Sequence, residues 1–538
     1  MLTEIGVAIE NKDFERVKTL VETIIEKHKD TFSFDHLHAD NTFKLLWESM
    51  FSCLATDNTK ITHKQCLACI RLLSRDKTHL NKIITEEHVN ILLRNANLLD
   101  ESSCVFLTSE NNDIVVEGLK CLCNIVYQCE KVQLLCCANN TVNCLILRLR
   151  IYFECNVPYD IKYFDVRLLF LLTAFNKAIR LKITEELHGL TYLMELLDNI
   201  LHNSIEETSK TKQPDLHAEN VTLSCEVLKV LFNLTVNTNF DRSDDNDDDD
   251  DYSVWIRLVS ILRDFIVTST FVPLDRDNIV SNVVNLLTNV PAGCLDQLTI
   301  KNHWCNVEAL KVIVDFLDDR LSGSNVLYEN VSPVLLVLLN GSKAIATFRR
   351  SVRHRILPPL KDIMNRPEQG NSLRNKLCRL LTTPNVGLRD LVAELLFVLC
   401  KENVGRMIKY TGFGNAAGLF ANLGLLNKTP NPDYSSNSED SDTEEYLKYK
   451  DQINPVLGCY EPPKPNPFEC MSDEQQEHEV MQLVCKMDKL TREGVIQPCK
   501  IGDDGRPKPI EHVLQLQEEL LSHFNNVKNK DNPNDESD

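Results

Sequence analysis

Apolar residues recur at helical spacing from the N-terminus to about residue 427, and this periodicity limits the possible folds more than any other feature. In the first stretch, Phe14, Val17, Leu20, Val21 and Ile24 fall on one side of a helix, as packing against a neighbouring helix requires. The alternation of a β-strand is nearly absent. Turn residues separate the helical stretches every few tens of residues, which is the spacing of short helix pairs. The sequence therefore predicts an all-α fold.

A weak internal repeat runs through the same region. Its copies are apolar helices, most of which end in an asparagine followed by an apolar residue, and the last copy is less exact: Glu117–Val126, Glu226–Leu234, Val283–Val290 and Leu391–Val398. The first two resemble the third helix of an armadillo repeat, in which each helix set buries its apolar face by stacking on the next set. We therefore expect an armadillo/HEAT-type superhelical solenoid whose inner helices line a concave groove. The alternative is a non-repetitive helical bundle.

The charge and the cysteine content argue against several classes of protein. The chain has 58 basic and 78 acidic side chains and a formal net charge of −20, so phosphate-dominated binding of nucleic acid is unfavourable. No segment approaches the roughly 18 consecutive apolar residues of a membrane span, and the N-terminus lacks the pattern of a signal peptide. Nearly all of the 20 cysteines fall within apolar helical patterns. We therefore expect a cytoplasmic protein with reduced, buried thiols.

Cys66 and Cys69 form a C-x-x-C sequence, which can bind zinc or perform redox chemistry. No second pair of cysteines or histidines follows at the spacing of a zinc finger. Both residues also fit the inward face of a helix, and we interpret them as core residues. We expect neither a metal ion nor another cofactor.

Polar segments interrupt the helical pattern. The acidic run Asp244–Asp251 lacks the glycine and the terminal glutamate of an EF-hand, and we interpret residues 240–252 as a disordered loop. A stretch rich in proline, serine and acidic residues predicts a flexible tether. The predicted domains are a solenoid over residues 1–427, the tether over 428–467, amphipathic helices over 468–524 and a polar, frayed tail over 525–538.

Two amphipathic helices are expected beyond the tether. Ser472 and Gln475 fit a capping box at the start of the first helix. The apolar stripe of the first helix is Val480, Leu483, Val484, Met487 and Leu490, and that of the second is Ile510, Val513, Leu514, Leu520, Leu521 and Phe524. Such helices can pack back on the solenoid or dock into a groove of a partner, and the sequence leaves both possibilities open.

Several long sequence blocks resemble the synembryn family: Arg71–Lys77, Asp165–Ala174, Glu402–Gly418, Ile453–Val456 and Met471–Glu479. The resemblance extends from about residue 40 to residue 500. It implies a guanine nucleotide exchange factor and folding chaperone for the α subunits of heterotrimeric G proteins, with an armadillo/HEAT fold. It also implies a monomer that binds the α subunit, GDP-bound or nucleotide-free, in the absence of β and γ subunits. We expect it in the cytoplasm, with recruitment to the cell cortex.

An exchange factor of this kind performs no covalent chemistry. It must bind the nucleotide-free α subunit more tightly than the loaded one, since only a differential affinity shifts the equilibrium between the two states. About 5 kcal/mol of differential binding free energy is needed to convert a mostly loaded population into a mostly empty one. A concave solenoid that wraps a segment of the partner can supply this difference, whereas a small surface patch is a poor source of it.

Partner-binding residues are expected on the inner helices. Arg71 and Arg75 are four residues apart, so we expect them on one helix face, where they can grip a carboxylate such as the free C-terminus of a partner. The alternative is an internal ion pair with an acidic residue of a neighbouring repeat. Further candidates at corresponding inner-helix positions, where amides and rings can contact a bound segment, are Asn124, Phe164, Phe232 and Asn233. Phe232 can equally be a core residue.

Ser436 and Ser441 are expected phosphorylation sites. Each lies three residues before an acidic residue, Glu439 and Glu444, which is the pattern that an acidophilic kinase of the casein kinase two type selects. The family resemblance implies activation by phosphorylation in this region. The basic pairs that can hold a phosphate are Arg349 with Arg353 and Arg406 with Lys409. The alternative is that these cations are solvated or pair with internal acids.

No arrangement of residues indicates a catalytic centre. Gly412–Gly418 superficially resembles a dinucleotide-binding loop, but its third glycine is displaced by one position and no strand precedes it. Two other functions stay open. An armadillo adaptor such as a nuclear-import receptor would need ladders of tryptophan and asparagine in its groove, whereas tryptophan occurs only at Trp47, Trp255 and Trp304. A holdase without exchange activity would share every residue named above.

Overall fold

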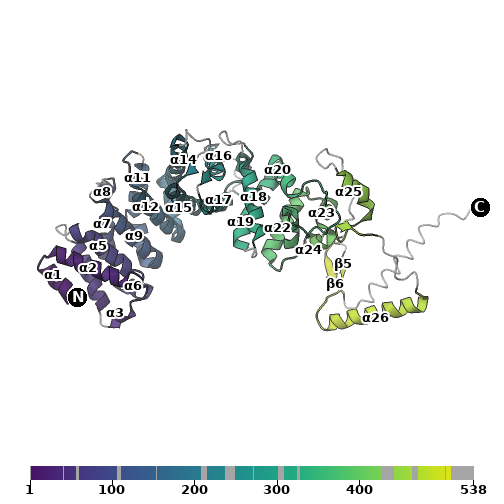
Figure 1. Cartoon of the computed structure of the whole chain (residues 1–538), viewed down its shortest axis with the longest axis horizontal. Helices are drawn as coiled ribbons and strands as arrows, with labels where there is room; N and C mark the ends of the chain where they lie inside the picture. Colours follow the sequence, from purple (N-terminus) through teal and green to yellow (C-terminus); the bar gives the residue numbers. More distant parts are fainter. Residues whose placement is uncertain are drawn as a thin grey trace, which may run out of the picture. The chain divides into compact units, whose positions relative to one another are not determined.

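We describe the protein from a computed structural model (Figure 1). It describes residues 2–510 apart from 40–41, 56–59, 106–110, 153, 208–214, 237–248, 271, 301–307, 324–327, 427–441, 463–470 and 503. The chain divides into two compact units, Met1–Ile313 and Val314–Asp538. The predicted second C-terminal helix, beyond Ile510, and the tail over 525–538 lie outside the described residues.

Most of the described residues of the first unit are helical. The helices are α1 (Leu2–Glu10), α2 (Phe14–His28), α3 (Asp35–Ala39), α4 (Thr42–Leu54), α5 (Lys60–Leu73), α6 (Lys77–Ile83), α7 (Glu86–Asn95), α8 (Glu101–Cys104), α9 (Asn112–Gln128), α10 (Glu130–Ala138), α11 (Thr141–Arg150), α12 (Tyr159–Phe175), α13 (Lys177–Leu181), α14 (Gly189–Glu207), α15 (Ala218–Thr235), α16 (Asp249–Val267) and α17 (Pro273–Leu287). A π-helical turn, Lys182–Glu186, follows α13, and a 3₁₀ helix, Ala292–Thr299, follows α17. Helix α18 (Ala309–Ser322) crosses the boundary between the units.

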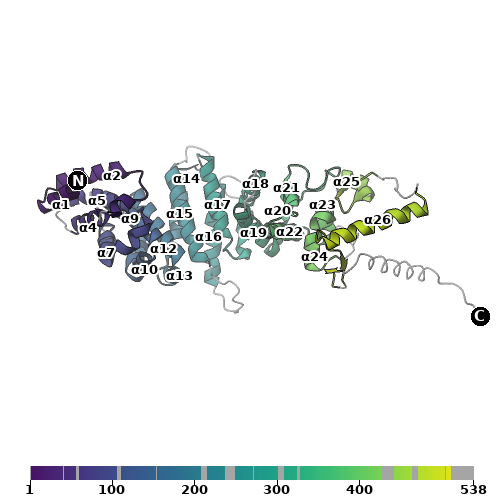
Figure 2. The same cartoon turned by 90° about the horizontal axis from the view of Figure 1, so that it is seen from below.

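The helices of the first unit are stacked in two rows. In one row, which we call the ladder row, α2, α5, α9, α12, α15 and α17 each contact the next helix. In the other row, α4, α7, α10, α11, α14 and α16 do the same, and each helix of this second row also contacts a helix of the ladder row. Figure 2 shows α14, α15, α16 and α17 side by side. Repeated stacking of this kind is how a helical repeat protein buries its apolar faces, so the predicted all-α repeat fold is confirmed.

The apolar periodicity of the sequence explains this stacking. In α2, Val17, Leu20, Val21 and Ile24 are all buried, as the first helical stripe predicts. The apolar repeats at 117–126, 226–234 and 283–290 lie in α9, α15 and the end of α17, which are all members of the ladder row. The sequence repeat therefore marks equivalent positions in the stack.

A buried ion pair joins α11 to α12 inside the first unit. Arg148 donates from Nε to Asp165 Oδ2 at 2.8 Å and from Nη1 to the Ala96 carbonyl oxygen at 3.0 Å, and Tyr152 donates to Asp165 Oδ2 at 3.0 Å. Arg148 is 0% exposed and Asp165 is 2% exposed. Burial alone would lower the pKa of the Arg148 guanidinium, but the charge and hydrogen bonds of Asp165 raise it overall and keep it protonated.

The second unit is also mainly helical. Its helices are α19 (Tyr328–Ala344), α20 (Ala346–Ile356), α21 (Leu373–Leu380), α22 (Val386–Leu399), α23 (Val404–Thr411), α24 (Phe413–Leu423), α25 (Glu444–Tyr449) and α26 (Asp473–Arg492). Helix α22 contacts α19, α20, α21, α23 and α24, and it carries the fourth sequence repeat, 391–398. A 3₁₀ turn, Lys450–Gln452, follows α25. The predicted capping box is present, because Ser472 and Gln475 exchange hydrogen bonds at the start of α26.

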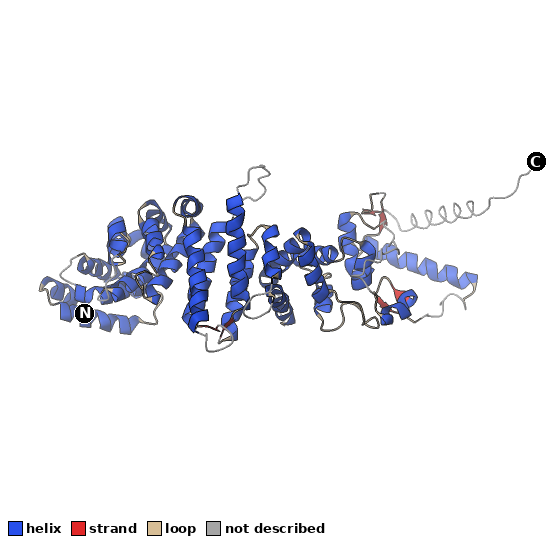
Figure 3. Cartoon of the chain, turned by 90° about the horizontal axis from the view of Figure 1, so that it is seen from above, coloured by secondary structure: helices blue, strands red, loops and turns tan. Residues whose placement is uncertain are grey.

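Strands are short and few among the described residues, as Figure 3 shows. They form three pairs: β1 (Asp215–Leu216) with β2 (Ser269–Thr270), parallel; β3 (Ile453–Asn454) with β4 (Cys459–Tyr460), antiparallel; and β5 (Cys499–Ile501) with β6 (Pro507–Pro509), antiparallel.

Two predictions about polar segments differ from the structure. Helix α16 begins at Asp249, so residues 249–252 are helical and do not belong to a disordered acidic loop. Acidic residues are favourable in the first turn of a helix, where the helix dipole is positive. Residues 442–462, predicted as tether, contain α25, β3 and β4 and contact the rest of the second unit. The rest of the predicted loop, residues 240–248, lies outside the described part of the chain. The same holds for the rest of the predicted tether, residues 428–441 and 463–467.

Candidate functional site

A line of charged and aromatic side chains crosses four consecutive helices of the ladder row, α5, α9, α12 and α15. We call it the charged ladder; it consists of two clusters whose members are Arg71, Glu117, Lys120 and Phe164, and Arg167, Phe170, Glu226 and Lys229. The two clusters meet on α12, where Phe164 and Arg167 are three residues apart and therefore neighbours on the helix surface.

The first cluster contains the predicted Arg71. Its Nε donates to Glu117 Oε2 at 2.9 Å, and Lys120 Nζ donates to Glu117 Oε1 at 2.8 Å. Lys120 Nζ also lies 5.4 Å from the centre of the Phe164 ring, a cation–π distance. The Arg71 side chain is 33% exposed, whereas that of Glu117 is 10% exposed. Arg71 is thus engaged in the internal ion pair that was the alternative interpretation, while part of its guanidinium remains accessible.

The second cluster was not predicted. Arg167 Nη1 and Lys229 Nζ both donate to the same oxygen, Glu226 Oε1, at 2.9 and 2.8 Å. Both cations lie over the Phe170 ring, at 6.0 and 5.9 Å from its centre. Each cluster combines two cations with one carboxylate, so each has a formal charge of +1 on a chain whose net charge is −20. This charge favours an acidic group of a partner.

The prediction that Arg71 and Arg75 share a helix face is wrong. Helix α5 ends at Leu73, and Arg75 lies in the turn that follows. The turn is fixed by Asp76, whose Oδ2 accepts a hydrogen bond from the Phe34 amide at 3.1 Å. Arg75 donates from Nη1 to the Lys29 carbonyl oxygen at 2.6 Å and lies 5.2 Å from the centre of the exposed Phe32 ring. Its guanidinium therefore covers the end of α2 instead of extending the face that carries Arg71.

The predicted asparagines connect neighbouring helices of the ladder row. Asn124 Nδ2 donates to the Arg71 carbonyl oxygen at 3.5 Å, and Asn233 Nδ2 donates to that of Phe170 at 3.2 Å. Asn289 makes the same link to Phe232, at 3.2 Å. We call these links the asparagine bridges. In each bridge the acceptor carbonyl oxygen also accepts a hydrogen bond from the hydroxyl of the residue three positions later in the same chain segment. These residues are Ser74, Thr173 and Thr235, respectively.

The asparagine bridges change the interpretation of four candidate residues. The Nδ2 groups of Asn124 and Asn233 contribute to the fold, since each donates to a main-chain carbonyl of the preceding ladder-row helix with which it packs. Phe232 corresponds to Phe170 in this pattern and not to Phe164, so the two predicted rings are not at equivalent positions. Both predicted rings are half-buried, which leaves part of each available to a partner.

Three of the four predicted phosphate-pairing cations lie close together in the second unit. Arg353 hydrogen-bonds Tyr410, and Lys409 pairs with Asp442 and lies 4.3 Å from the centre of the Tyr446 ring. Burial raises the pKa of the Cys400 thiol to about 12, while the positive charges of Arg353, Arg406 and Lys409 act to lower it. These three cations are therefore near the same buried thiol. The fourth, Arg349, donates from Nη1 to the Ser342 carbonyl oxygen near the end of α19 at 2.9 Å.

Residues 442–462 form a segment that we call the strap. Thr443 caps α25 and donates its hydroxyl to the Leu360 carbonyl oxygen, and the Tyr446 side chain is buried. The Tyr460 amide donates to the Ile363 carbonyl oxygen at 2.7 Å. Desolvation raises the pKa of the Tyr446 hydroxyl to about 12, and the Asp442 carboxylate adds to the shift. The strap is thus anchored by hydrogen bonds and by the ion pair between Lys409 and Asp442.

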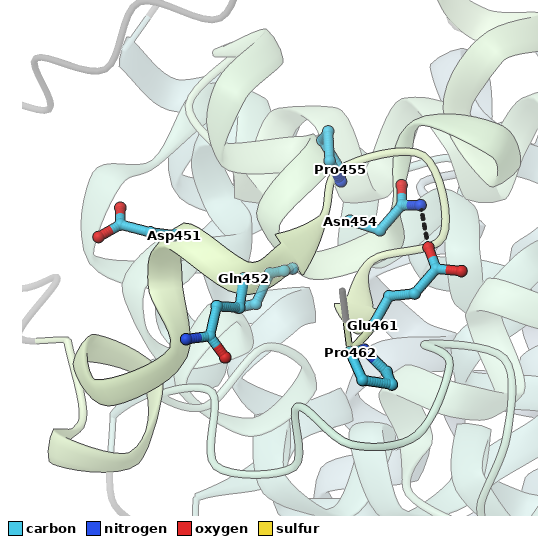
Figure 4. A pocket seen from close by; sticks show the side chains of 7 residues that line it. Asp451, Gln452, Asn454, Pro455, Glu461 and Pro462 are labelled. Carbon is cyan, nitrogen blue, oxygen red and sulfur yellow. Dashed lines mark hydrogen bonds between the residues drawn. The ribbon is translucent and has the colours of Figure 1, made fainter. Parts of the chain in front are cut away.

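The strap also covers the start of α24. The amides of Phe413 and Gly414 donate to the carbonyl oxygens of Pro455 and Val456 at 2.9 and 3.0 Å. Two amides at the start of α24 thus donate to the chain itself, whereas a nucleotide-binding loop directs such amides to a phosphate. An adjoining pocket has a volume of about 600 Å³. Two of its lining residues, shown in Figure 4, are joined by a hydrogen bond from Asn454 Nδ2 to Glu461 Oε2 at 2.5 Å. Its charged lining residues, Asp451 and Glu461, are both acidic, so it does not suit a phosphate.

The predicted phosphorylation sites, Ser436 and Ser441, lie outside the described residues. Ser441 immediately precedes Asp442, which is described and pairs with Lys409.

The predicted apolar stripe of α26 is mostly exposed in the described part of the chain. Val480, Leu483 and Leu490 are 47%, 58% and 38% exposed, and Met481 beside them is 64% exposed. Val484 and Met487 are half-buried. An exposed apolar stripe on a helix is typical of a surface that binds a partner.

Chemistry at metal ions or thiols finds no support among the described residues. No group of three or more histidine, cysteine or carboxylate side chains is placed to hold a metal ion. Cys66 and Cys69 are fully buried, and burial raises the pKa of the Cys69 thiol to about 12, as expected of core residues. No single described helix is long and apolar enough to span a membrane, and one bent pair, Glu130–Ala138 with Thr141–Arg150, passes that test by length and composition.

Comparison with known proteins gives a family match over most of the chain. The Ric8 family profile, described as guanine nucleotide exchange factor synembryn, matches residues 66–506. "Chaperone Ric-8" of Drosophila pseudoobscura pseudoobscura is 38% identical over 95% of this chain and 97% of its own length. "Chaperone Ric-8A" of Danio rerio is 38% identical over 95% of this chain and 96% of its own length. Among solved structures, an engineered protein has a TM-score of 0.45 at 12% identity, covering 81% of this chain and 95% of that chain.

Proposed function

Because the chain belongs to the synembryn family of guanine nucleotide exchange factors, we propose that it binds α subunits of heterotrimeric G proteins in their nucleotide-free state. It assists the folding of the α subunit and releases GDP from it, in the absence of β and γ subunits. The observation that carries the proposal is the charged ladder, a positively charged line across four stacked helices of an acidic protein.

The exchange reaction follows from differential binding. If the helices of the ladder row hold the α subunit more tightly when its nucleotide site is empty, binding lowers the affinity for GDP, and incoming GTP weakens the complex by the same factor. A shift from mostly loaded to mostly empty requires about 5 kcal/mol of differential binding free energy. A contact that extends over α5, α9, α12 and α15 can supply this through many groups at once, with the α26 stripe as a second contact surface.

Charge reversal at Arg71 tests the proposal. The unchanged chain should accelerate GDP release from a purified α subunit of the inhibitory or q class. The variant Arg71→Glu should lower this acceleration by roughly tenfold, equivalent to about 1.4 kcal/mol, because it replaces an accessible cation of the charged ladder by an anion. The measurement is the rate of loss of radiolabelled GDP, with calorimetry to compare binding to GDP-loaded and empty α subunits.

Lys343→Glu is the matched control for that test. Lys343 on α19 pairs with Glu394 on α22 at 2.5 Å, so its reversal also breaks an ion pair between neighbouring helices, but in the second unit, which contains no residue of the charged ladder. An equal loss in the control would mean that the ladder is not the site. Equal affinity for loaded and empty α subunits would remove the exchange role and leave a holdase.

The adaptor alternative is disfavoured by the described tryptophans. Trp47 is fully buried, and its Nε1 donates to His88 Nδ1 at 3.3 Å. Trp255 is 8% exposed. These two side chains therefore belong to the core and do not form a ladder that binds an extended peptide. Trp304 lies outside the described residues.

The proposal includes regulation by phosphorylation at Ser436 and Ser441. A phosphate on Ser441 would enter next to Asp442, which already pairs with Lys409, and Arg353 and Arg406 lie around the same buried Cys400. Phosphate oxygens form charge-assisted hydrogen bonds with such cations and can order the chain that carries them. This arrangement supports a phosphate that fixes the strap more firmly to α23.

Alanine at Ser436 and Ser441 should remove the stimulation of GDP release that an acidophilic kinase of the casein kinase two type produces. We expect about a threefold loss relative to the treated unchanged chain, since a partly exposed phosphate forms few new hydrogen bonds. The assay compares GDP release before and after kinase treatment. If the alanine variant is stimulated as strongly as the unchanged chain, these serines do not regulate the protein.

A further inference from the structure

The two clusters of the charged ladder differ in how their carboxylates are satisfied. In the first, Glu117 has one donor on each oxygen: Arg71 on Oε2 and Lys120 on Oε1. In the second, Arg167 and Lys229 both donate to Glu226 Oε1. Glu226 Oε2 is buried and accepts no hydrogen bond from any described residue. The same residue types thus occur in two arrangements with different hydrogen-bond counts per oxygen.

This difference decides which lysine can leave its carboxylate. If Lys120 moved away, Glu117 Oε1 would lose its donor, and a buried acceptor without a donor is unfavourable. If Lys229 moved away, Glu226 Oε1 would keep Arg167. The planar guanidinium can then engage both carboxylate oxygens in a bidentate pair, which supplies Oε2 with a donor. The departure of Lys229 therefore allows Glu226 to gain a better hydrogen-bond arrangement.

Lys229 is also suitably placed to meet a ligand. Its side chain is 34% exposed, whereas that of Glu226 is 4% exposed, so the cation is the accessible member of the pair. It lies 5.9 Å from the centre of the half-buried Phe170 ring, which holds it near the surface of α15. Arg167, 39% exposed, stands next to it and keeps the surroundings positive.

We propose that Lys229 is the residue with which the charged ladder takes up a carboxylate of its partner, while Arg167 compensates Glu226 and Lys120 stays in its own pair. The proposal rests on the proposed function, because it specifies the chemistry by which the α subunit is held. The carboxylate is either the free C-terminus of the α subunit or an acidic side chain near it.

The test is a double-mutant cycle on the full chain. The probe is a synthetic peptide of the C-terminal segment of an α subunit in three forms: with a free terminal carboxylate, with a terminal amide, and with its acidic side chains replaced by amides. Lys229→Met should weaken binding of the unmodified peptide by about tenfold. It should not change the affinity for the neutralised peptide that lacks the carboxylate bound by Lys229, since that peptide has already lost the contact. The form that is unaffected identifies the carboxylate.

Lys120→Met is the matched control, because Lys120 also pairs with the glutamate three residues before it and has a similar exposure of 30%. It should change the affinity for all three peptides by the same factor. Lys229→Arg should restore most of the binding, because it keeps the charge. Thermal unfolding of each variant checks that the fold is retained.

The proposal fails if the Lys229→Met effect is equal for all three peptides, if Lys120→Met shows the selective effect instead, or if the unmodified peptide does not bind while the intact α subunit does. These outcomes leave the proposed function standing. If the unchanged chain binds no α subunit at all, the proposed function itself fails.

Discussion

Asp165→Leu is expected to destabilise the first unit by about 3–5 kcal/mol, because it leaves the Arg148 guanidinium buried without its counter-charge. Tyr152 loses its acceptor at the same time. Hydrogen–deuterium exchange is the suitable measurement, since the chain has two units and a single unfolding transition cannot be assumed. The exchange rates of the amides in α11 and α12 should rise by the factor that corresponds to this loss in free energy of unfolding.

Two further variants make this prediction specific. Arg148→Met combined with Asp165→Leu should recover part of the loss, because an apolar pair avoids the buried charge. Arg257→Gln breaks an exposed pair with Asp198 at 3.8 Å and should change stability by less than about 0.5 kcal/mol. Equal effects of Asp165→Leu and Arg257→Gln would show that the buried ion pair contributes no more to stability than an exposed one.

Gly458→Ala is expected to release the strap from α23 and α24 at a cost of about 2–4 kcal/mol. Gly458 has a φ angle of +70°, and an added Cβ would lie 2.8 Å from Pro367 Cγ and 2.9 Å from Gly412 Cα. The substitution therefore combines an unfavourable backbone conformation with an overlap that the neighbouring backbone cannot relieve. Amides that the strap protects, such as those of Phe413, Gly414 and Tyr460, should exchange faster, and the strap should be cleaved more readily by protease.

Gly494→Ala separates the two effects. Gly494 has nearly the same φ angle, +71°, but an added Cβ would meet no atom within 4 Å. It should cost only about 1 kcal/mol, from the left-handed backbone alone, and should leave the strap in place. If Gly458→Ala leaves exchange at Phe413 and Tyr460 unchanged, the close approach of Gly458 to Gly412 does not hold the strap. If it does release the strap, stimulation of GDP release by the kinase should also fall.

The local part of the fold could be predicted from the sequence. Helical periodicity places Val17, Leu20, Val21 and Ile24 in the core, and the buried positions match. The recurring asparagines mark helices of one row, because each donates to a main-chain carbonyl of the preceding helix in that row. The capping box at Ser472 depends on neighbouring residues alone and is present.

Contacts between distant segments could not be predicted in the same way. Proline, serine and acidic residues made the strap resemble a tether, but its stability depends on Leu360, Ile363 and Lys409, which no local pattern connects with residues 442–462. For the charged ladder, the spacing of Glu226 and Lys229 was visible in the sequence. Their relation to Arg167 requires knowing that α12 and α15 are neighbours. A search for acidic residues followed by lysine three positions later on repeat helices would have found both clusters.

The asparagine bridges have a consequence for how damage spreads in the first unit. Each bridge joins one helix only to its predecessor in the ladder row, so the links are independent of one another. Stability in such an array is a sum of nearest-neighbour terms. Loss of one amide, for instance at Asn233, should therefore weaken the contact between α12 and α15 and leave the contacts between the preceding helices of the ladder row unchanged.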